Sequence, residues 1–75
     1  MLEKLAHKTY KITYLDYPRF ASLFIGPQGD AIIQNGVMRP FKFNIKDLSE
    51  NETRIVNCLG LELAEEVRKI SGEYI

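Results

Sequence analysis

The chain has 75 residues, of which 45% are hydrophobic and 27% are charged, and its formal net charge is zero. This composition excludes an intrinsically disordered chain and predicts one globular domain over residues 1–75. A single cysteine and a single histidine exclude an intrachain disulfide and a Cys/His zinc set.

The first predicted strand covers residues 8–15. Tyr10, Ile12 and Tyr14 alternate there with polar residues, which is typical of a strand with one buried face. Pro18 then interrupts the pattern, because it has no N–H group to donate and restricts the residue before it. A connection between strands is expected at this point.

A second strand is predicted over residues 20–25. Almost all of its side chains are apolar, so it suits a strand that is covered on both faces. Residues 26–29 read Gly-Pro-Gln-Gly and predict a turn, since Pro27 has the backbone angle that a turn needs.

The third and fourth strands are predicted over residues 30–34 and 37–45. Between them, Asn35 and Gly36 form the strongest signal for a two-residue hairpin turn. Pro40 cannot donate a hydrogen bond within a sheet, so the fourth strand is expected at an edge or with a bulge.

One carboxy-terminal helix is predicted over residues 50–71. Ser49 and Glu52 have the spacing of a capping box at its start, and Gly72 suits its end. The apolar side chains that should face the core are Ile55, Val56, Leu59, Leu63, Val67 and Ile70.

Gly60 and Leu61 fit an unbroken helix poorly. Glycine inside a helix costs about 1 kcal/mol relative to alanine, and Leu61 would project away from the core. Either the helix bends at Gly60 or Leu61 contacts something else.

The predicted fold is therefore α+β, with a four-stranded antiparallel β-meander over about residues 8–46 and one helix packed on one face of the sheet. The charge is divided between these parts. Residues 1–46 carry a formal charge of +4 and residues 47–75 a charge of −4. Such a division indicates a polar interaction surface or attraction within one domain.

The apolar side chains outnumber what one helix can cover, because residues 20–25 and 31–33 place large apolar groups on both faces of the sheet. A second copy of the chain is the simplest cover for the second face, and the contact candidates are Leu23, Ile25, Met38 and Leu61. Alternatively, Leu2 and Leu5, or Tyr74 and Ile75, fold over that face. We prefer the partner.

Nucleic-acid binding is the alternative function. Lys11 and Lys42 are expected on the outer sheet face and Lys46 is near them in sequence, which resembles the basic sheets that hold single strands. The zero net charge weakens attraction to phosphates. The acidic helix is interpreted as a solvated face rather than as a mimic of phosphates.

No arrangement of residues predicts catalysis. His7 and Cys58 are isolated, and no phosphate-binding or dinucleotide motif is present. No enzyme, cofactor or metal is expected. Residues 1–7 do not resemble a signal peptide and no run of about 18 apolar residues predicts a membrane span. We expect a cytosolic, homodimeric binding module with a regulatory or inhibitory role toward a protein target, of the kind found as phage or mobile-element accessory proteins.

Overall fold

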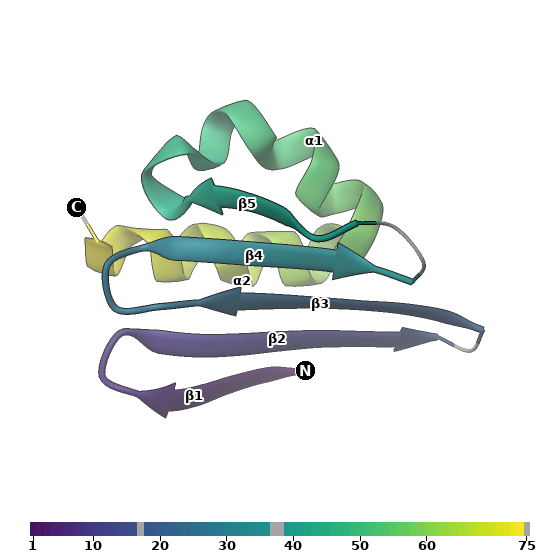
Figure 1. Ribbon diagram of the computed structural model, residues 1–75, viewed down its shortest axis with the longest axis horizontal. Coiled ribbons are helices and arrows are strands. Elements are labelled where there is room, and N and C mark those ends of the chain that lie inside the picture. Colours follow the sequence, from purple (N-terminus) through teal and green to yellow (C-terminus); the bar gives the residue numbers. More distant parts are fainter. Residues whose placement is uncertain (17, 37–38, 75) are drawn as a thin grey trace.

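The computed structural model describes residues 1–16, 18–36 and 39–74. Within these ranges, five strands form one antiparallel sheet whose spatial order, β1-β2-β3-β4-β5, follows the chain (Figure 1). The strands are β1 (Leu2–Ala6), β2 (Thr9–Asp16), β3 (Arg19–Ile25), β4 (Asp30–Asn35) and β5 (Phe41–Asn44). A short 3-10 turn, η1 (Ile45–Asp47), leads into helices α1 (Leu48–Leu59) and α2 (Leu61–Ser71), and a second 3-10 turn, η2 (Gly72–Tyr74), follows.

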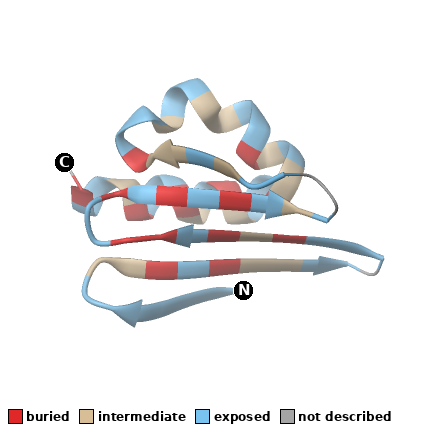
Figure 2. Cartoon of the chain, viewed as in Figure 1, coloured by how far each residue is buried: buried red, intermediate tan, exposed pale blue. Residues whose placement is uncertain are grey.

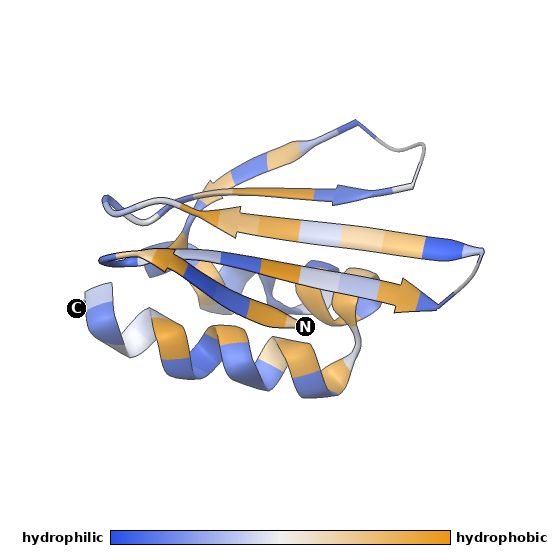
Figure 3. Cartoon of the chain, turned by 90° about the horizontal axis from the view of Figure 1, so that it is seen from below, coloured by the Kyte–Doolittle hydropathy of each residue, from blue (hydrophilic) through white to orange (hydrophobic). Residues whose placement is uncertain are grey.

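Both helices lie on the same face of the sheet (Figure 3). Alternate residues of β2, β3 and β4 are buried against them, as the two-residue period of a strand requires (Figure 2). The largest fully buried side chains are Ile12, Leu23, Ile25, Ile45, Ile55, Leu59 and Val67. One apolar core between sheet and helices therefore stabilises the domain.

The prediction of four strands is wrong because Leu2–Ala6 forms a fifth, β1, at the edge beside β2. Leu2 pairs with Ile12 and Lys4 pairs with Tyr10, and the pairing is irregular after Lys4. Every residue of β1 is exposed, so backbone pairing holds the strand without a buried face. A hydrophobic pattern could not reveal it.

The predicted hairpin turn at Asn35-Gly36 is also wrong. Asn35 is the last residue of β4 and pairs with Ala21, so the two-residue turn does not form there. Gly36 begins the connection to β5 with a positive φ of 55°, and its amide donates to the Phe20 carbonyl. The fourth predicted strand is shorter than expected, because β5 begins at Phe41; Val37 and Met38 lie outside the described residues. β5 lies at the edge of the sheet, where Pro40 predicts it.

The prediction of one helix over residues 50–71 is wrong, because this part of the chain forms two helices, α1 and α2. The Gly60 amide donates to the Val56 carbonyl and ends α1, while the Gly60 carbonyl accepts from the Ala64 amide and begins α2. The sequence left two alternatives, a bend at Gly60 or a separate contact for Leu61, and the structure shows that the helix is interrupted at Gly60. The capping box does not form, because α1 continues directly from η1 and has Asp47 at its N-cap position without a side-chain cap.

The turn predicted over residues 26–29 is confirmed: the Gly29 amide donates to the Gly26 carbonyl over 2.9 Å. Among the described residues, no helix has the length and apolar character needed to cross a membrane.

Hydrogen bonds of two tyrosines hold η2 against the core side of the sheet. The Tyr74 hydroxyl donates to the Lys8 carbonyl over 2.5 Å, and the Tyr10 hydroxyl donates to the Glu73 carboxylate. Tyr74 is buried among the core residues. Neither Tyr74 nor β1 therefore covers the second face of the sheet; Ile75 lies outside the described residues.

The Tyr10–Glu73 hydrogen bond predicts a loss of stability in alkali. This bond, together with burial, raises the pKa of Tyr10 from 10.0 to about 12. A raised pKa in the folded state means that the neutral phenol is stabilised by folding, so this contribution is complete below pH 10 and is lost as the pH rises toward 12. Urea unfolding measured over this range should show a steep decline in the parent chain and a shallower one in Tyr10→Phe. Equal slopes in the two chains would contradict the prediction.

Candidate functional site: the open sheet face

The helices leave the opposite face of the sheet uncovered, and we call this surface the open sheet face (Figure 3). The cross-strand register and the alternation of burial identify its side chains. They include Glu3, Lys11, Thr13, Leu15, Phe20, Ser22, Phe24, Asp30, Ile32, Gln34 and Lys42. The two lysines and the two acids cancel, so the open sheet face has no net formal charge.

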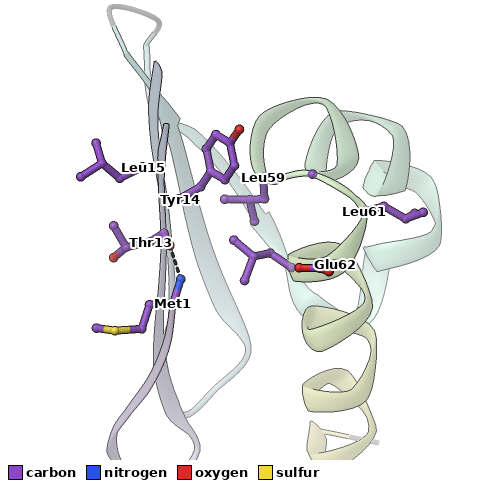
Figure 4. A pocket seen from close by; sticks show the side chains of 9 residues that line it. Met1, Thr13, Tyr14, Leu15, Leu59, Leu61 and Glu62 are labelled. Atoms are coloured by element: carbon purple, nitrogen blue, oxygen red, sulfur yellow. Dashed lines mark hydrogen bonds between the residues drawn. The ribbon is translucent and has the colours of Figure 1, made fainter. Parts of the chain in front are cut away.

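Met1, 70% exposed, points to the same side of the sheet as Thr13 and Leu15 (Figure 4), and four apolar side chains of β2, β3 and β4 on the open sheet face are also exposed to solvent. The exposed fractions are 71% for Leu15, 44% for Phe20, 43% for Phe24 and 40% for Ile32. Leu15 is the cross-strand partner of Phe20, and Phe24 is the partner of Ile32. Directly paired side chains on one face contact each other, so these four form two apolar pairs and not scattered groups. Exposed apolar side chains that gather in this way mark interaction surfaces.

One row of side chains crosses the open sheet face from edge to edge, and we call it the central row. In spatial order from β1 to β5 it contains Glu3, Lys11, Phe24, Ile32 and Lys42. An aromatic and an aliphatic side chain occupy its centre with a lysine on either side. Its two ends carry opposite charges.

The predicted contact residues Leu23 and Ile25 do not belong to this face. Both are fully buried in the core, opposite Ile12 and Tyr10 of β2. Their neighbour Phe24 faces outward instead. Both parities of this strand are mostly apolar, and its register against β2 shows which one is outward. The sequence signal that the prediction missed is Ser22, the polar residue that shares the parity of Phe20 and Phe24.

Leu61, the third contact candidate, is separate from the open sheet face. Leu61 begins α2 with 64% of its surface exposed, and its side chain points away from the sheet (Figure 4). Met38 lies outside the described residues. The three described candidates, Leu23, Ile25 and Leu61, therefore do not form one surface.

A shallow hollow of about 450 Å³ lies where the helix break approaches β2 and the first residue. Figure 4 shows Tyr14 and Leu59 between the sheet and the helices, whereas Thr13 and Leu15 point to the opposite side. The hollow therefore borders the core side of the sheet, and Leu15 belongs to the open sheet face.

The predicted nucleic-acid residues are divided by the fold. Lys11 and Lys42 lie in the central row, on either side of Phe24 and Ile32. Lys46 belongs to η1 and lines a hollow with residues of both helices, which are on the other side of the sheet.

The two residues that could serve nucleophilic chemistry are also apart. His7 lies in the connection between β1 and β2, at one end of the sheet, whereas Cys58 accepts a hydrogen bond from the Asn35 side chain at the opposite end of β4 (Figure 1). The fold does not assemble them into one site.

One curated protein offers a partial comparison. The "Probable DNA double-strand break repair Rad50 ATPase" of Aquifex aeolicus (strain VF5) is 34% identical to this chain over 64 residues. The match covers 85% of this chain and 6% of that protein. No protein-family model matches the chain, and no solved structure matches it. The chain thus spans a small part of the relative's length, and the match does not carry that protein's activity over to it.

Proposed function

We propose that this protein is a small cytosolic binding module that acts by protein–protein contact, as a regulatory or inhibitory accessory protein, and that it forms a homodimer through the open sheet face. The observation that carries this proposal is the two apolar cross-strand pairs, Leu15 with Phe20 and Phe24 with Ile32, which are exposed to solvent on a face that no element among the described residues covers.

The free energy of burial favours a partner on this face. At about 25 cal/mol for each Å² of apolar surface, covering the exposed part of each of these side chains contributes about 1–2 kcal/mol. A domain of this size has a net stability of only about 4–11 kcal/mol. Four such side chains therefore represent a large fraction of the energy available to the fold.

Two further observations support the proposed class and compartment. The placement of His7 and Cys58 at opposite ends of the sheet favours binding over nucleophilic catalysis. Cys58 is a free thiol, which suits the reducing cytosol.

A second candidate function is binding of single-stranded nucleic acid. The central row favours it, because Lys11 and Lys42 could contact phosphates while Phe24 stacks on a base. The relative's name refers to DNA repair, but the match spans 6% of that protein. The acids Glu3 and Asp30 on the same face oppose phosphates, and Lys46 is on the helix side. We therefore rank this function second.

Sedimentation velocity at low and moderate salt tests the proposed function. We expect a dimer of about 17 kDa, twice the 8.7 kDa of the chain, that persists at both salt concentrations because its central contacts are apolar. In Phe24→Thr, which retains a strand-forming residue, we expect the monomer. Copurified material with the ultraviolet absorbance of nucleic acid, released by salt, would favour the second candidate.

A further inference from the structure

We propose that the partner on the open sheet face is a second copy of this chain in one particular register, in which Phe24 packs on Phe24 of the second copy and Glu3 pairs with Lys42 of the second copy. This inference rests on the proposed function and adds to it the orientation of the two chains. The order of charges along the central row carries it.

The central row has a centre and two ends of opposite charge. Phe24 is the third of its five residues, Glu3 stands at one edge of the sheet and Lys42 at the other. Strands are spaced about 4.8 Å apart, so each end lies about 10 Å from Phe24. A rotation that exchanges the two ends therefore brings unlike charges together at both sides of the interface.

Two copies related by a two-fold axis bury the same surface on each. One possible axis lies between the two sheets, parallel to β3 and above Phe24, and it reverses the order of the central row in the second copy. Glu3 then faces Lys42 of the second copy, and the aliphatic stem of Lys11 covers Ile32 of the second copy. The same axis places Phe20 opposite Phe20 of the second copy. Aromatic side chains then meet in the middle, and the ion pairs lie at the rim, where charges are least costly to desolvate.

The other two-fold arrangements bring like charges together or lose the ion pairs. An axis between β3 and β4 puts Lys11 opposite Lys42 of the second copy. An axis along the central row puts each charged residue opposite its own copy. An axis between β2 and β3 leaves Lys42 beyond the edge of the partner. Like charges in contact destabilise an interface, so the axis through Phe24 is the favoured one.

Sheet packing allows this geometry. Two sheets that pack face to face cross at about −30°, which displaces the ends of the central row by about 5 Å along the strands. The Lys42 side chain is long enough to span that displacement. The face measures about 19 Å across the strands and about 14 Å from Phe20 to Phe24, or about 270 Å² on each copy, which is below the area of a standard specific interface. The dimer is therefore expected to be weak, and its dissociation constant must be measured over a concentration series.

Charge reversal tests the register. Glu3→Lys and Lys42→Glu should each raise the dissociation constant about tenfold or more, because each creates two like-charge contacts between the copies. Glu3→Lys also places a lysine opposite Lys11 of the same chain, and its effect on the monomer is measured separately by urea unfolding. A mixture of the two single variants should dimerise like the parent chain, because the introduced lysine then faces the introduced glutamate, and Lys42 of the first variant faces Glu3 of the second. Added salt should partly restore each single variant by screening the repulsion.

Matched controls separate this effect from a change in overall charge. Glu65→Lys and Lys46→Glu make the same two charge changes at exposed positions of α2 and η1, away from the open sheet face. Neither should change the dissociation constant. Circular dichroism of each variant establishes that the fold is retained.

The outcomes distinguish this inference from the proposed function. If Phe24→Thr dissociates the dimer but the charge reversals have no effect, the open sheet face is the interface and this register is overturned. If the mixture of single variants remains as weakly associated as each alone, the pairing of Glu3 with Lys42 is likewise overturned. If the parent chain is monomeric at all concentrations, or Phe24→Thr leaves the dimer intact, both the register and the homodimer through this face fail.

Discussion

Replacing Leu23 by threonine should lower the free energy of unfolding by about 3–5 kcal/mol, because the substitution opens a cavity in the core and buries a hydroxyl group without a partner. Leu23 is fully buried between Ile12 on β2 and Ile33 on β4. A loss of this size is a large fraction of the stability of a 75-residue domain. Thermal and urea unfolding followed by circular dichroism measure it.

Phe24→Thr is the matched control, since it introduces the same residue one position further along β3. Phe24 faces the open sheet face with 43% of its surface exposed, so its replacement should cost only about 1 kcal/mol in the isolated chain. The two variants are compared at high dilution, because self-association adds a concentration-dependent contribution. Equal losses of unfolding free energy from the two substitutions would contradict the structure, in which Leu23 is buried and Phe24 is exposed.

The second large effect is expected at the helix break, where Gly60→Ala should destabilise the domain by about 1–3 kcal/mol. Gly60 has φ +86° and ψ 165°, a conformation that is essentially restricted to glycine. An added Cβ would meet no atom within 4 Å, so the cost comes from the backbone and not from a clash. The urea midpoint is the measurement.

Gly72→Ala is the control for helix propensity and for the loss of glycine flexibility in the unfolded chain. Gly72 has φ −61° and ψ −24°, and its added Cβ would also meet no atom within 4 Å. Because alanine adopts this conformation readily, the substitution should leave the stability unchanged or raise it by about 0.4–1 kcal/mol. If Gly60→Ala were as harmless as Gly72→Ala, α1 and α2 could join without strain, and the break would have another cause.

The sequence predicts the parts of the fold that depend on neighbouring residues. The alternation of Tyr10, Ile12 and Tyr14 indicates one buried face of β2, and the Gly-Pro-Gln-Gly turn follows from the backbone preferences of its own residues. The poor fit of Gly60 in a helix is also visible in the sequence, although the pattern alone left two alternatives there.

Elements that depend on pairing are harder to predict. β1 has no buried residue and is held by backbone hydrogen bonds to β2, so its side chains carry no periodic signal. The hairpin signal of Asn35-Gly36 is local, and the turn begins one residue later than predicted because β3 extends far enough to pair with Asn35. The predicted capping box is likewise displaced by η1, which places the helix start at Leu48.

The candidate site shows the same division. The sequence alone predicts an excess of apolar side chains, a second sheet face that needs a cover, and the placement of Lys11 and Lys42 on that face. Only the tertiary structure decides that Leu23 and Ile25 are core while Phe20 and Phe24 are exposed. Both pairs are equally apolar, so their hydrophobicity does not show which pair is buried. The register decides it, because Leu23 lies opposite Ile12 and cross-strand partners share a face of the sheet.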